Sequence, residues 1–118
     1  MQIKYVGDDG QVLRCKADGR ITQNAFEPGN DSFADTFGPD VYGRKVLLDL
    51  AESDYIDSSG VGWLLGSSKK FKQAGGALVL YSVPPTVQQL LQLLRLGSVL
   101  KVAADSAAAR QLALGEAA

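Results

Sequence analysis

Two kinds of apolar pattern alternate along the second half of the chain. Lys45–Leu50 is a nearly continuous apolar run, which is typical of a strand buried on both faces of a sheet. Ala77–Tyr81 has the same character. Between these runs, apolar side chains recur at helical spacing from Val61 to Phe71, which predicts an amphipathic helix. The pattern therefore predicts two buried strands joined by a helix.

The first third of the chain has a different pattern. Ile3–Val6 and Val12–Ala17 are short strand-like runs around Gly7-Asp8-Asp9-Gly10, a composition that indicates a β-hairpin. From Thr22 to Gly43 proline and glycine interrupt the chain repeatedly, and Asp31–Phe37 is the one helical candidate there.

The last third continues the alternation of helices and strands. Pro84-Pro85 opens an apolar-periodic helix that we expect to end at Gly97. Val99–Ala103 reads as a fifth strand, and Ser106–Leu114 as a helix capped by Asp105 or Ser106. This order predicts an α/β fold: a five-stranded mixed, mostly parallel sheet with an N-terminal antiparallel hairpin and three to four helices.

Length and charge restrict the function classes. The 118 residues suggest a single domain over 1–118. Twelve basic and thirteen acidic residues give no electrostatic reason to expect direct nucleic-acid binding. No apolar run approaches the ~20 residues that span a bilayer, so we expect no membrane insertion. The single cysteine, Cys15, fits a core position in a cytoplasmic protein.

The candidate chemistry is narrowed by the absence of histidine. A chain without histidine has neither the usual general base nor the usual zinc ligand. It also shows no carboxylate pair and no Gly-rich phosphate loop. We therefore expect no enzymatic activity, no cofactor and no metal site.

One polar junction stands out where the Lys45–Leu50 strand leads into the central helix. Asp57, Ser58, Ser59 and Gly60 are residue types that cap helix N-termini well. In open α/β sheets, functional sites usually lie at the carboxyl ends of the strands. The sequence therefore predicts two hydroxyls at such a position.

This junction carries a family resemblance. Asp57-Ser58-Ser59-Gly60-Val61-Gly62, with its flanking elements, resembles the STAS domain, which bacterial anti-sigma factor antagonists share with the tails of sulfate transporters. The resemblance covers about Lys45 to Leu114, and Gly19-Arg20-Ile21 matches the bend after the second strand. It departs from the family at Glu27-Pro28-Gly29-Asn30, which interrupts the first helix.

The resemblance implies an anti-sigma factor antagonist that binds an anti-sigma serine/threonine kinase and so regulates transcription indirectly. Its phosphoacceptor would be Ser58, and a phosphatase would be a further partner. The positions expected to contact the partner come from the motif and from the outward face of the central helix: Asp57, Ser59, Gly60, Gly62, Trp63, Gly66 and Thr22, the last where antagonists usually have an acidic residue.

Other readings of these residues remain open. The serines and Asp57 could act only as helix caps, and Trp63 could fill the edge of the core. The protein could be an unmodified scaffold or adaptor subunit of a transport or signalling complex. A small enzyme or nucleotide-binding domain is the third reading, because helix N-termini attract phosphates.

Overall fold

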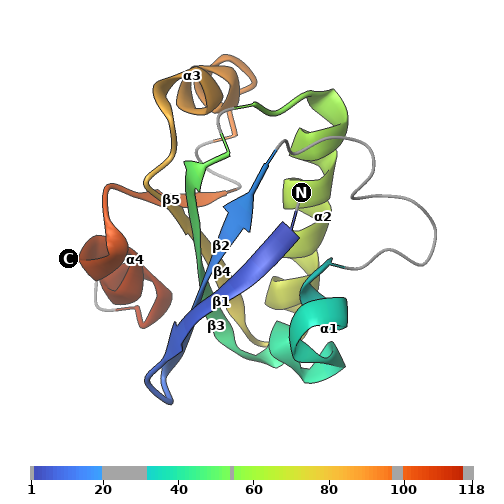
Figure 1. Ribbon diagram of the computed structural model, residues 1–118, viewed down its shortest axis with the longest axis vertical. Helices are drawn as coiled ribbons and strands as arrows, with labels where there is room; N and C mark the ends of the chain where they lie inside the picture. Colours follow the sequence, from blue (N-terminus) through green and yellow to red (C-terminus); the bar gives the residue numbers. More distant parts are fainter. Residues whose placement is uncertain (1, 20–31, 54, 97–99, 116–118) are drawn as a thin grey trace.

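The computed structural model describes residues 2–19, 32–53, 55–96 and 100–115, and shows a five-stranded sheet with helices on both faces (Figure 1). In chain order the elements are β1 (Gln2–Asp8), β2 (Val12–Asp18), α1 (Ser32–Phe37), the 3-10 helix η2 (Pro39–Gly43), β3 (Lys45–Glu52), α2 (Ser58–Gln73), β4 (Ala77–Tyr81), α3 (Pro85–Leu93), β5 (Lys101–Ala103) and α4 (Ser106–Ala113).

The sheet has the predicted mixed topology. Its spatial order is β1-β2-β3-β4-β5, in which β1 and β2 are antiparallel and all other neighbours are parallel. Side chains of α1, α2 and α3 form the core on one face of the sheet, whereas α4 packs on the other face. The α/β fold class is therefore confirmed.

The central strand β3 is buried from both sides. Val46, Leu47, Leu48 and Leu50 have no exposed surface. Val46 and Leu48 belong to the core beneath α2, and Leu47 to the core beneath α4. This confirms that the continuous apolar run marks a strand covered on both faces.

The hairpin strands are longer than the sequence indicated. The predicted β-hairpin is confirmed, but β1 extends through Gly7 to Asp8, which the sequence analysis had placed in the connection. The turn is held by Asp9, whose Oδ1 accepts the N–H groups of Gln11 and Val12, each at 2.9 Å. An aspartate that binds the backbone ahead of it allows a tighter turn.

The helices follow the predicted order with different ends. α1 confirms the helical candidate, but η2 was missed because its proline was taken only as an interruption. α3 ends at Leu93, short of Gly97, because Arg95 adopts a left-handed conformation (φ 58°) that stops the helix. Gly97 and Val99 lie outside the described residues. Asp105 caps α4 by accepting the Ala108 N–H at 2.9 Å.

Cys15 occupies the core position expected of it. It is fully buried on β2, and its Sγ lies 3.6 Å from the carbonyl oxygen of Leu47. Burial raises the pKa of the thiol to about 12, with a smaller contribution from the negative charge of Asp49. The thiol is therefore protonated at neutral pH and unreactive as a nucleophile.

Candidate functional site

The candidate site lies where β3 leads into α2, at the carboxyl edge of the sheet. Asp57 is the N-cap of α2: its backbone is extended and its Oδ1 accepts the Gly60 N–H at 2.9 Å. The same oxygen accepts a hydrogen bond from the Ser59 hydroxyl at 2.5 Å. Asp57 and Ser59 thus form one hydrogen-bonded cap around the start of the helix.

The cap keeps a negative charge beside the serines. The hydrogen bond from Ser59 and, after it, that from the Gly60 backbone N–H lower the pKa of the Asp57 carboxyl below its usual range. Asp57 is therefore ionised at neutral pH. A second negative group placed next to it adds to an existing charge.

Ser58 differs from its neighbour in exposure. It is the first residue of α2 and is exposed, whereas Ser59 is half-buried. The residues around it are fixed: Ile56 before it and Gly60 and Val61 after it are buried. The fold therefore exposes Ser58 to solvent between buried neighbours.

The outward face of α2 continues this exposed surface. Gly62 and Gly66 are exposed, as the helical spacing predicts. A Cβ built on Gly66 would meet no heavy atom within 4 Å. Lys70 and Gln73 follow on the same face and are exposed. We call the exposed Ser58, Gly62 and Gly66 the Ser58 surface.

Trp63 does not belong to this surface, and the prediction that it points outward was wrong. Its side chain is only 6% exposed and stacks on Phe33 of α1, with ring centroids 5.4 Å apart and an interplanar angle of 2°. Phe33 also meets Phe71 edge-on at 5.2 Å. The short α1 covers this flank of α2 and widens its buried face, so Trp63 packs in the core.

Two residues near the junction were missed by the sequence interpretation. Ser53 is fully buried at the end of β3, and its hydroxyl donates to the carbonyl oxygen of Ala17 at 2.9 Å, which ties this strand end to β2. Tyr55 is 47% exposed next to the cap. The sequence did contain a signal for an exposed Tyr55, because an aromatic residue stands there next to a run of polar residues. Thr22, predicted to contact the partner, lies outside the described residues.

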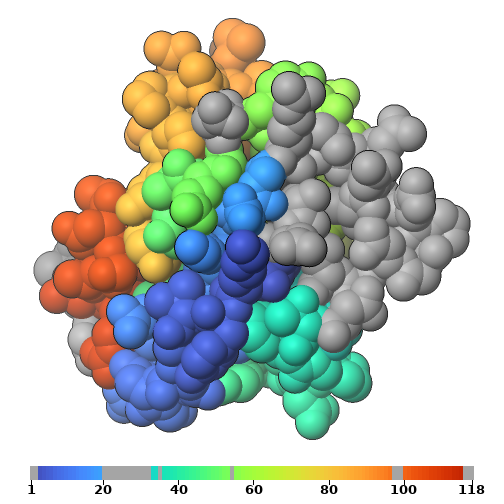
Figure 2. Space-filling view, in the orientation of Figure 1, coloured from blue at the N-terminus to red at the C-terminus, as the bar shows by residue number. Residues whose placement is uncertain are grey.

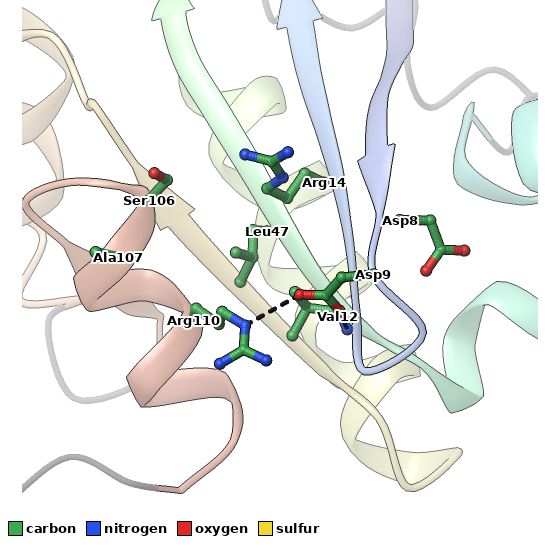
Figure 3. A pocket seen from close by; sticks show the side chains of 8 residues that line it. All are labelled: Asp8, Asp9, Val12, Arg14, Leu47, Ser106, Ala107 and Arg110. Carbon is green, nitrogen blue, oxygen red and sulfur yellow. Dashed lines mark hydrogen bonds and ion pairs between the residues drawn. The ribbon is translucent and has the colours of Figure 1, made fainter.

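A separate pocket lies between the hairpin turn and α4, on the face of the sheet opposite α2 (Figure 3). Its volume is about 230 Å³, and it is lined by Asp8, Asp9, Val12, Arg14, Leu47, Ser106, Ala107 and Arg110. Arg110 Nε donates to Asp9 Oδ2 at 3.1 Å, and its guanidinium also donates to Gln11. These contacts join two parts of the chain far apart in sequence, and they pair the positive charge of Arg110.

Two other kinds of feature are absent from the described ranges. No cluster of three or more aspartate, glutamate, cysteine or histidine side chains could hold a metal ion there. None of the helices in these ranges combines the length and apolarity that crossing a bilayer requires.

Comparisons with known proteins match one domain family over most of the chain. The family described as the STAS domain matches residues 15–109. The proposed anti-sigma factor antagonist BtrV of Bordetella bronchiseptica is 36% identical over 66 residues, which are 56% of this chain and 57% of that protein. The chain spans about half the length of the curated relatives it matches.

Solved structures resemble the whole described fold. The crystal structure of a proposed anti-sigma factor antagonist from Thermotoga maritima superposes with a TM-score of 0.77 at 20% identity, covering 95% of this chain and 92% of that one. The phosphorylated form of the Bacillus cell fate determinant SpoIIAA gives a TM-score of 0.62 at 18% identity, covering 93% and 98%. At these identities the likeness shows the fold.

Proposed function

The chain belongs to the STAS domain family, and from this premise we propose that it is an anti-sigma factor antagonist switched by phosphorylation of Ser58. Unmodified, it binds an anti-sigma factor serine kinase in the cytoplasm and prevents that kinase from holding a sigma factor. The kinase supplies the nucleotide, metal and base of the phosphorylation reaction, and this chain supplies the hydroxyl. A phosphatase restores the unmodified state.

The observation that carries the proposal is the exposure of Ser58 in the capped first turn of α2. A kinase active site has to reach the hydroxyl, and the exposed position permits this. Ser59 is less suitable, because it is half-buried and its hydroxyl donates to Asp57. Two similar proteins support the proposal: BtrV is described as a proposed anti-sigma factor antagonist, and the structural neighbour SpoIIAA, described as an anti-sigma factor antagonist, has also been solved in a phosphorylated form.

The physical effect of the modification falls on binding more than on folding. A phosphate in the first turn of a helix lies near unpaired N–H groups and the positive end of the helix dipole, so the fold tolerates it. It brings about −1.5 to −2 charges beside the ionised Asp57. A partner surface that packs closely on Ser58, Gly62 and Gly66 would have to desolvate that charge, which disfavours the complex.

The proposal is tested by incubating the protein with a purified candidate serine kinase and ATP, followed by mass mapping of the modified peptide. The expected product carries one phosphate on Ser58. The Ser58→Ala variant is expected to remain unmodified, whereas Ser59→Ala is expected to accept phosphate. Modification at Ser59, or equal labelling of the Ser58→Ala variant, would refute the assignment.

A further inference from the structure

Exposed large apolar side chains lie on two parts of the molecule. Within the described residues they are Tyr5, Val6, Tyr55, Leu93 and Leu94, of which Leu93 is 79% exposed. Tyr5 and Val6 lie on the edge strand β1. The other three lie in the segments that follow β3 and β4. Leu93 and Leu94 are adjacent, and exposed apolar side chains that lie together mark an interaction surface more often than isolated ones do.

The orientation of α3 decides where its leucines point. Val87 and Leu91 are buried and face the core. At about 100° per residue, Leu90 and Leu93 lie on one flank of this stripe, with Leu94 beside them at the end of the helix. Leu90 is half-buried, and Leu94 is 47% exposed. We call Leu90, Leu93 and Leu94 the leucine flank.

The opposite flank of α3 is turned toward the edge of the sheet. Gln88 and Gln92 line a cavity of about 280 Å³ together with Val102 of β5. Since β5 is the outermost strand on this side, the leucine flank is turned the other way, back toward the β3–α2 junction. That junction carries Tyr55 and Ser58.

Topology and the two views place α3 and the start of α2 at one end of the molecule. β3 and β4 are parallel neighbours, so the segments that leave their carboxyl ends start from one edge of the sheet. Figure 1 shows α3 and the first turn of α2 at the same end of the molecule, and Figure 2 shows the side chains of both segments at that end. The leucine flank and the Ser58 surface therefore lie at the same end of the molecule.

The charges near the leucine flank indicate which kind of partner surface would bind it. From Ser82 to Ala104 the sequence contains no acidic residue, and Arg95, directly after Leu94, is exposed. A lipid surface fits poorly, because interfacial helices carry a strongly basic polar face and α3 contains no basic residue. A protein surface with apolar side chains and an acidic border fits both features.

We propose that the leucine flank docks into an apolar recess of the anti-sigma factor serine kinase, bordered by acidic side chains that face Arg95. This inference rests on the proposed function and adds a second contact to it. The apolar contact contributes affinity and is not itself changed when Ser58 is phosphorylated. The phosphate on Ser58 determines whether the Ser58 surface can pack against the kinase. Affinity and switching are thus carried by different residues.

The test measures binding to a purified candidate anti-sigma factor serine kinase by calorimetry. The double variant Leu93→Gln, Leu94→Gln is expected to raise the Kd about tenfold or more. Val6→Gln is the matched control, since it removes an exposed apolar side chain on β1, and it is expected to change the Kd by less than about twofold. Thermal midpoints of both variants verify that the fold is intact.

The outcomes separate the two proposals. If the double variant binds as tightly as the wild type while Ser58→Asp abolishes binding, the leucine flank is not a contact and the proposed function stands. If the wild-type protein neither binds the kinase nor is phosphorylated by it, both fail. A wild-type dimer in light scattering that the double variant converts to a monomer would assign the flank to a second copy of this chain and would overturn the inference.

Discussion

The hydroxyl of Ser59 donates to the carboxylate of Asp57 at 2.5 Å, and this contact separates two adjacent serines that look equivalent in the sequence. Ser59 belongs to the helix cap, whereas Ser58 is exposed to solvent. The site therefore contains Ser59, whose hydroxyl is part of the helix cap, and directly before it Ser58, which is exposed.

The first prediction is that the two serines differ in their effect on stability. Ser59→Ala is expected to lower the free energy of unfolding and to raise the pKa of Asp57, because it removes the largest cause of the lowered value. Ser58→Ala is expected to stay within about 0.5 kcal/mol of the wild type, as for most surface substitutions. Urea unfolding measures both. Equal destabilisation by the two variants would contradict the structure.

The second prediction concerns Trp63 as a core residue. Trp63→Ala is expected to cost about 3–5 kcal/mol of stability, because it leaves a cavity against Phe33 and Phe71. Urea unfolding again provides the measurement. Trp63 is the only tryptophan, so its fluorescence reports the core directly. Its emission is expected to remain unchanged on partner binding; a large shift would place the ring in an interface.

The third prediction contrasts two glycines. Gly66→Ala is expected to stabilise the protein by about 1 kcal/mol, because the added Cβ meets open space on a helix. Gly76→Ala is expected to destabilise it, since its Cβ would lie 2.3 Å from the Arg44 carbonyl oxygen and 2.4 Å from that of Tyr42. Thermal unfolding measures both changes. Weaker kinase binding by the more stable Gly66→Ala variant would support close approach at the Ser58 surface, and unchanged binding would argue against it.

The fourth prediction concerns acid. The pKa of Asp8 is lowered to about 2, first by its hydrogen bonds with Arg44, at 2.6 and 2.7 Å, and then by the Gly10 N–H. The pKa of Asp9 is lowered to about 2 by the N–H groups of Val12 and Gln11, and then by Arg110. A carboxyl whose folded pKa lies below its unfolded value of about 3.9 stabilises the fold above that value.

This contribution is lost as the pH falls from about 4 toward 2. The double variant Asp8→Asn, Asp9→Asn is therefore expected to lose less stability over that range than the wild type does. Urea midpoints at pH 7, 4 and 2.5 provide the test. Parallel pH profiles for the two proteins would show that the hairpin carboxylates do not contribute.

The local patterns of the sequence were enough for the element order, the mixed sheet and the cap. Apolar runs and turn residues act over a few positions, so β4 was predicted with its observed bounds, Ala77–Tyr81. The prediction that Trp63 points outward failed because the burial of this side chain depends on Phe33, thirty positions earlier in the sequence. Phe33 lies on a helix of only six residues, too short for the sequence to suggest that it covers α2. The early end of α3 depends on one backbone angle at Arg95, which a leucine-rich pattern does not reveal.

The leucine flank was also beyond sequence reasoning. A helix with the pattern of α3 places most of its leucines in the core, as Leu91 shows. That Leu93 remains exposed follows from the short length of α3 and from the lack of a covering element among the described residues.

The most direct measurement of the central claim is the affinity of Ser58→Asp for the serine kinase, taken together with its thermal midpoint. Ala107→Asp is the matched control, because it places a carboxylate at an exposed site in the first turn of α4, on the other face of the sheet. The account predicts that Ser58→Asp abolishes binding with a midpoint within a few degrees of the wild type, and that Ala107→Asp binds normally. Normal kinase binding by a folded Ser58→Asp protein would contradict it.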